Sequence, residues 1–186
     1  MAIANDKANV SVGKGVVGGY LYWAPAGTAL PTDYSTALAA AYKNLGYVTD
    51  EGATLSVEAD SNTFKDLNGT DIATSTGGKT RTLHAILAEM REDALKAYYG
   101  AANVTVAQNG DITVTHTNAD VEHCVLVLEL VLRDGRRMRR VIEDAQPTEW
   151  GDQTILYSDL LTLDLTWTLN GEQPIHDYIQ APAAGA

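Results

Sequence analysis

The segment 73–80 is the stretch of the chain closest to a known chemical motif. It reads Ala-Thr-Ser-Thr-Gly-Gly-Lys-Thr, which resembles a nucleotide phosphate loop, where a glycine, four residues and Gly-Lys-Ser/Thr follow one another. Ala73 stands where such a loop has its first glycine, and residues 68–71 do not read as the buried strand that precedes it. Backbone amides would then not converge on a phosphate. We therefore interpret this segment as a glycine-containing loop end.

The histidines and the cysteine are the other residues that could catalyse a reaction or bind a metal. His84, His116, His123 and His176 are not at metal-ligand spacing. His123 and Cys124 would point to opposite faces of one strand, so they are a poor nucleophilic pair, and Cys124 is interpreted as a buried structural thiol. No Gly-x-Ser-x-Gly elbow is present. The sequence predicts no enzyme activity, no metal and no cofactor.

A cluster of arginines offers a different chemistry, the binding of anions. Its members are Arg133, Arg136, Arg137, Arg139 and Arg140. A nucleic-acid patch would combine cations with aromatic side chains in basic surroundings, and this segment has neither. Two interpretations stay open: a solvated hairpin, and salt bridges between subunits. The second is plausible chemistry because arginine binds carboxylates in bidentate fashion, and residues 141–186 contain eight acids and no Lys or Arg.

The chain as a whole is acidic. Its 186 residues include 24 Asp and Glu against 13 Lys and Arg, a formal net charge of −11. This balance argues against a protein that grips duplex DNA, because phosphate contacts need clustered cations. The single cysteine excludes a disulfide framework within the chain. The apolar runs are too short to insert in a membrane, and the first nine residues lack the apolar core of a signal peptide. We expect one domain that folds in a reducing cytosol.

Hydrophobic periodicity predicts a mainly β protein with one short α-helix. The clearest pattern is the alternation of Leu161, Leu163, Leu165, Trp167 and Leu169 with polar residues, which is typical of a strand with one buried face. The expected strands are 16–23, one within 44–57, 80–89, 104–106, 112–114, 122–133, 136–143 and 160–169. We expect a helical turn around 35–42 and the helix at 92–99, ended by Gly100.

These elements predict an antiparallel β-sandwich or partial barrel over residues 16–170. Residues 1–15 are expected to form an N-terminal arm, and 171–186 a C-terminal arm or tail. The polar, turn-rich segment 58–79 reads as a long loop within the domain. Loops of this length are uncommon in compact domains, and those that occur are either functional or disordered.

Several short motifs follow one another along the chain. They are the runs Gly19–Asp33, Leu45–Gly52, Ala94–Gly100 with Asn103–Thr105, Gly135–Ile142 and Pro147–Asp152. In this order and spacing, over about residues 16 to 170, they resemble major tail tube proteins of long-tailed (siphovirus-type) phages of actinobacteria. Segment 58–79 departs from the family pattern.

The resemblance implies a structural virion protein with a tail-tube fold. Copies of the chain would form hexameric rings that stack into a hollow tube, and a sheet from each subunit would join its neighbours to line the lumen. Implied partners are other copies, the tape-measure protein, the tail terminator and the distal tail proteins, with double-stranded DNA passing through without specific binding. The location would be the virion tail, assembled in the host bacterial cytoplasm, without membrane insertion.

In such a tube, three sets of residues have expected roles. The polar face of the last strand would face the lumen or solvent: Thr162, Asp164, Thr166 and Thr168. Contacts between rings would use the arms and the long loop, around Phe64, Lys65, Asp66, Leu67 and Asn68. The arginine cluster would join subunits. Two alternatives stay open: a related tube protein of a contractile injection or secretion system, and a non-catalytic β-sandwich binding module.

Overall fold

A computed structural model of the chain describes residues 10–172 and 174–182. The outer parts of both expected arms, 1–9 and 183–186, lie outside the described residues. The structure confirms the predicted mainly antiparallel β fold with a short α-helix. The strands are β1 (Lys14–Gly15), β2 (Leu21–Pro25), β3 (Lys43–Asn44), β4 (Val48–Lys65), β5 (Asp71–Leu87), β6 (Val104–Val106), β7 (Ile112–Val114), β8 (Cys124–Val131), β9 (Arg137–Trp150), β10 (Leu163–Leu169) and β11 (Ile175–Ile179). Helix α1 (Glu92–Tyr99) is followed by a 3₁₀ turn (Ala101–Asn103).

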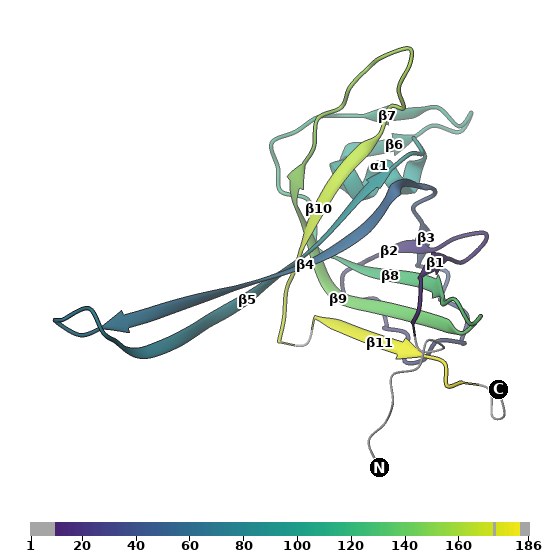
Figure 1. Ribbon diagram of the computed structural model, residues 1–186. Coiled ribbons are helices and arrows are strands. Elements are labelled where there is room, and N and C mark those ends of the chain that lie inside the picture. The colour runs from purple at the N-terminus through teal and green to yellow at the C-terminus, as the bar shows by residue number, and fades with distance from the viewer. Residues whose placement is uncertain (1–9, 173, 183–186) are drawn as a thin grey trace.

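A single large sheet runs through the protein in the order β3–β2–β8–β9–β10–β5–β4, with β1 added on β8 and β11 on β9. Strand β9 belongs to both halves of this sheet. Its first half pairs with β8 and β11, and its second half pairs with β10. The sheet thereby folds into two layers that cross each other, while the β4–β5 hairpin extends far beyond the body (Figure 1).

The main core lies between the two layers and includes the buried side chains of helix α1. Leu163, Leu165, Trp167 and Leu169 enter this core from β10, as the alternating pattern predicts. Leu161 does not, because β10 begins only at Leu163 and leaves Leu161 43% exposed. The predicted helix has the predicted bounds. It ends at Gly100, whose φ of +91° suits glycine and whose N–H donates to the carbonyl of Lys96.

Strand β8 is buried on both faces. Leu126 and its alternate neighbours face the main core, whereas Val125 and Val127 face a second cluster with Val141 and Tyr42. Residues 26–42 cover this second cluster as an irregular loop. The helical turn expected around 35–42 is therefore wrong.

The long loop predicted for 58–79 is also wrong. These residues continue β4 and β5 as an antiparallel ladder that reaches the pair Lys65 and Asp71. The ladder has no alternating apolar face: from position 71 to 80 every residue of β5 is exposed. Backbone pairing alone builds this part of the hairpin, so the periodicity that identifies a half-buried strand is missing.

Cys124 is expected to be unreactive in the folded protein. Its side chain is fully buried and its thiol donates to the carbonyl of Ala145 at 3.3 Å. Burial raises the pKa of Cys124 to about 12. At pH 8 only about one thiol in ten thousand would be ionised, and the thiolate is the reactive form. We expect Ellman's reagent to label the native protein far more slowly than the urea-unfolded protein. Equal rates in both states would contradict the burial of this residue.

Candidate assembly surfaces

One face of the sheet is polar and exposed. It is formed by β4, β5, β10 and the second half of β9 on the side away from the core. Residues directly opposite each other in a ladder share a face, and Thr54, His84, Thr166 and Glu149 stand in one row across the four strands. A second row holds Ser56, Thr82 and Thr168. Hydroxyl, imidazole and carboxylate groups make up the first row. The second row consists of hydroxyls and, on β9, the amide of Gln146.

The structure brings three of the four expected lumen-facing residues onto this face. Asp164, Thr166 and Thr168 are half-exposed on β10, and Thr162 lies just before the strand. Asp164 contacts His84 with 2.7 Å between Oδ1 and Nε2, and the hydroxyls of Thr148 and Thr168 are 2.9 Å apart. Whether the face lines a channel stays a prediction.

Both edges of this four-stranded region are open among the described residues. Strand β4 is the last strand in the sheet order, so its outer edge has no partner strand. On β9, pairing with β8 stops at Ala145 and pairing with β11 at Ile142, which leaves residues 146–150 paired only with β10. Open edges present unpaired N–H and C=O groups that can join another strand.

The hairpin tip holds the residues predicted to contact the next ring. Phe64 and Lys65 end β4, and Asp66, Leu67 and Asn68 form the turn. The Asp66 carboxylate accepts hydrogen bonds from the backbone N–H groups of Asn68 and Thr70, which orders the turn. Leu67 is 105% exposed and Phe64 48% exposed. The tip therefore presents apolar side chains to solvent at the far end of an ordered hairpin.

The arginine cluster is not a uniform surface patch. The prediction of an inter-subunit salt bridge is wrong for Arg139, which is 3% exposed and pairs with Glu129 inside the chain. Arg136 pairs with Asp134, and Arg140 pairs with Asp177 at 2.7 Å, so both already have carboxylate partners within the chain. Arg133 and Arg137 are exposed and form no ion pair with a described residue. For these two the inter-subunit role stays a prediction.

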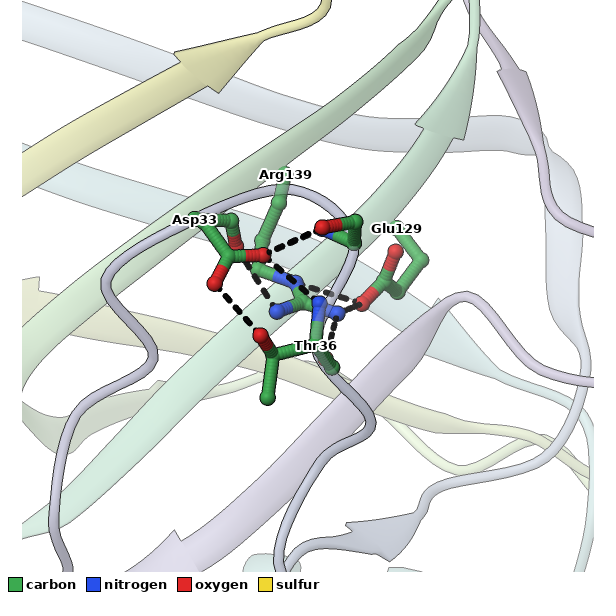
Figure 2. A network of polar contacts seen from close by, with 5 residues as sticks. Asp33, Thr36, Glu129 and Arg139 are labelled. Carbon is green, nitrogen blue, oxygen red and sulfur yellow. Dashed lines mark hydrogen bonds and ion pairs between the residues drawn. The ribbon is translucent and has the colours of Figure 1, made fainter.

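Arg139 instead fixes the loop 26–42 to the sheet. Its Nε donates to Glu129 at 2.7 Å, and its other nitrogens donate to the backbone carbonyls of Asp33 and Thr36 at 2.8 and 2.9 Å. Figure 2 shows the guanidinium between Glu129 and the loop. Hydrogen bonds from Thr36 and Ser35 hold the pKa of Asp33 well below the usual range of a carboxyl group. The loop is thus built around two charged groups with several partners each.

The structure contains two apolar surfaces that the sequence analysis did not predict, an exposed loop and a groove. The loop 151–162 between β9 and β10 exposes large apolar side chains: Ile155, Leu156, Tyr157, Leu160 and Leu161. An open groove of about 880 Å³ lies between residues 13–20 and the start of β4. The run Ile155-Leu156-Tyr157 between Gly151-Asp152 and Ser158-Asp159 was a usable signal for an exposed apolar loop. The groove had no sequence signal, because chain segments far apart in sequence form it.

Neither a metal site nor a phosphate loop is found in the part of the chain that the structure describes. No three His, Cys, Asp or Glu side chains gather as metal ligands within the described ranges. The segment 73–80, interpreted from sequence as a loop end, lies in β5 and is paired with β4, so it cannot wrap around a phosphate.

Sequence comparison decides the family. A family profile described as phage tail tube protein matches residues 4–180. The chain belongs to this family. As a tail tube protein it is a structural component of the virion tail and assembles with copies of itself into a tube.

The other comparisons found a weak structural likeness to this tail tube protein and no curated relative by sequence. Among solved structures, the tube-terminating cap of the anti-feeding prophage matches with a TM-score of 0.48 and 13% identity, covering 98% of this chain and 100% of that chain. No curated protein matches the tail tube protein's sequence. Its described residues include no helix with the length and hydropathy of a membrane span.

Proposed function

We propose that this protein forms hexameric rings that stack into the hollow tail tube of a long-tailed phage of actinobacteria, through which double-stranded DNA is delivered. The observation that carries the proposal is the four-stranded polar sheet with two open edges. An open edge is a liability in a monomer and a joining surface in a ring. The proposal treats residues 16–170 as the ring-forming domain and the segments on either side as arms.

The direction of the strands allows the two edges to join. Each neighbouring pair from β9 through β10 and β5 to β4 is antiparallel. Strands β9 and β4 therefore run in opposite directions, and β9 of one copy would continue the antiparallel sheet beyond β4 of the next. The contact is heterologous, because two different surfaces meet, and a heterologous contact closes into a ring when the rotation between copies allows it.

The polar face would line the lumen of the ring. Duplex DNA carries one negative charge per roughly 1.7 Å of its axis, and a cationic wall would hold it by releasing counterions. A wall of hydroxyls with Asp164 and Glu149 has no such attraction. The tape-measure protein would occupy the same lumen during assembly in the host cytoplasm, and terminator and distal tail proteins would bind the ends of the tube.

Electron microscopy of the purified protein tests the proposal. Under assembly conditions we expect hollow tubes of uniform width, with sixfold symmetry in end-on views. Small monodisperse particles at every concentration tested would overturn it.

Lysines on the polar face are expected to impair infection and spare assembly. Thr166→Lys combined with Thr168→Lys would place two cations per subunit on the proposed lumen wall. Tubes should form with normal dimensions, while the plaque count falls at least tenfold because DNA is held during passage. Thr105→Lys on β6, which is exposed outside the polar face, is the matched control. Normal plaque formation by the double variant would contradict a lumenal position.

A further inference from the structure

The loop 151–162 carries an apolar surface that no other part of residues 10–172 or 174–182 covers. Ile155 is 84% exposed, Tyr157 109% and Leu160 64%. The loop stands away from the body at the top of Figure 1. Single exposed apolar residues need no explanation, but a contiguous group of them marks a contact surface.

The groove offers an apolar surface of matching character. Its floor reaches the main core at Leu21, Leu83 and Leu128, and its rim includes Val17, 101% exposed, and Tyr47, 70% exposed. One wall is residues 13–20 and the other is the start of β4. The hydroxyl of Tyr20 accepts a hydrogen bond from the N–H of Val48 at 2.5 Å and ties the two walls together.

Three charged residues line the groove, Glu51, Glu89 and Arg140, and two of them have partners within the chain. Glu89 accepts a hydrogen bond from the N–H of Tyr47 at 2.9 Å, and Arg140 is paired with Asp177 at 2.7 Å. An anionic ligand would have to compete with Asp177 for Arg140. An uncharged apolar segment would not, and residues 153–158 (Gln-Thr-Ile-Leu-Tyr-Ser) contain no ionisable group except the Tyr157 hydroxyl.

The sheet register places the loop and the groove at the same end of the polar sheet. Trp150, which ends β9, pairs with Leu165, and Leu163 at the start of β10 pairs with Leu87 at the end of β5. Leu87 also pairs with Val48, the first residue of β4. The loop follows Trp150, and the groove lies beside Val48. When β9 of one copy adds to β4 of the next, the loop that follows β9 arrives beside the groove.

We propose that the loop 151–162 of one copy inserts its apolar side chains into the groove of the adjacent copy in the ring. This inference rests on the proposed function, because it uses the joining of β9 to β4. The sheet edges supply backbone hydrogen bonds, but such bonds can form in more than one register. The loop and groove add apolar burial at one defined position and so fix the register of the junction.

Cross-linking between introduced cysteines tests the inference. Tyr157→Cys is combined with Val17→Cys, and tubes are oxidised and run on a denaturing gel without reductant. We expect a ladder of covalent oligomers up to the hexamer. The native Cys124 is buried and does not contribute. Tyr157→Cys combined with Leu67→Cys, at the equally exposed hairpin tip, is the matched control and should give no ladder beyond that of Tyr157→Cys alone.

Electron microscopy of the same samples separates this inference from the proposed function. Intact tubes without a ladder would overturn the loop-in-groove contact but not the proposed tube, whereas absence of tubes in the unmodified protein would overturn both.

The variant Leu156→Asp gives a second test. Because Leu156 is 58% exposed, the monomer should unfold at an unchanged temperature, while the protein concentration needed for assembly should rise at least tenfold. Thr105→Asp on β6, which is exposed and lies outside both the loop and the groove, is its control for added charge. Equal assembly by the two variants would also overturn the contact.

Discussion

Replacing Arg139 with methionine is expected to lower the free energy of unfolding by about 3–5 kcal/mol. The substitution keeps a long apolar stem and removes the only cation among the described residues that pairs with Glu129. Glu129 is 8% exposed and lies opposite Arg139 in the β8–β9 ladder. A buried carboxylate without its partner is strongly destabilising. The carbonyls of Asp33 and Thr36 lose their donors at the same time. Urea unfolding followed by tryptophan fluorescence measures the change.

Two further variants separate the buried pair from general effects of the substitution. Arg137→Met removes an exposed arginine two positions away on the same strand, and it should change the free energy of unfolding by no more than about 0.5 kcal/mol. Arg139→Met combined with Glu129→Leu removes both charges and should be more stable than Arg139→Met alone, because no uncompensated charge stays buried. A double variant as unstable as the single one would show that the loss comes from the loop 26–42 rather than from the ion pair.

Two elements that sequence reasoning located, β10 and α1, have one face buried and the other not. Leu163, Leu165 and Trp167 alternate with polar residues because β10 packs one face on the core, and the bounds of α1 follow from an apolar face that ends at Gly100. In both cases the burial of one face determines the spacing of the apolar side chains along the sequence. The family resemblance then predicted assembly into a tube, which the side-chain pattern of a single strand cannot indicate.

The parts that the sequence did not show depend on which strands pair and in what register, and not on the period of the side chains. In the outer hairpin both faces are exposed, so the side chains carry no period and the residues read as a loop. In the arginine cluster, only the register of β8 against β9 distinguishes Arg139, opposite Glu129, from the exposed Arg137. The exposure of Leu161 has the same origin: it continues the alternating pattern of β10, but β10 begins two residues later.

Removing the outer half of the β4–β5 hairpin is expected to abolish tubes while leaving folded subunits. Ala59 and Lys79 are paired in the ladder, so residues 60–78 can be replaced with Asn-Gly, which closes a two-residue turn between them. The deleted residues are exposed on both strands, and the free energy of unfolding should change by less than about 1 kcal/mol. In the proposed tube these residues join one ring to the next, so electron microscopy should show single rings or free subunits.

A second hairpin variant tests whether stacking of rings uses the tip of the hairpin or its sides. A variant that keeps the full ladder but carries Phe64→Ser and Leu67→Ser removes only the exposed apolar side chains of the tip. If the tip inserts into the neighbouring ring, this variant should assemble as poorly as the deletion; a tenfold rise in the concentration needed for assembly corresponds to about 1.4 kcal/mol. If stacking uses the sides of the hairpin, the serine variant should form normal tubes and the deletion should not. If the deletion variant forms tubes of normal length, the hairpin does not stack the rings, and the contacts between rings must come from the body or the arms.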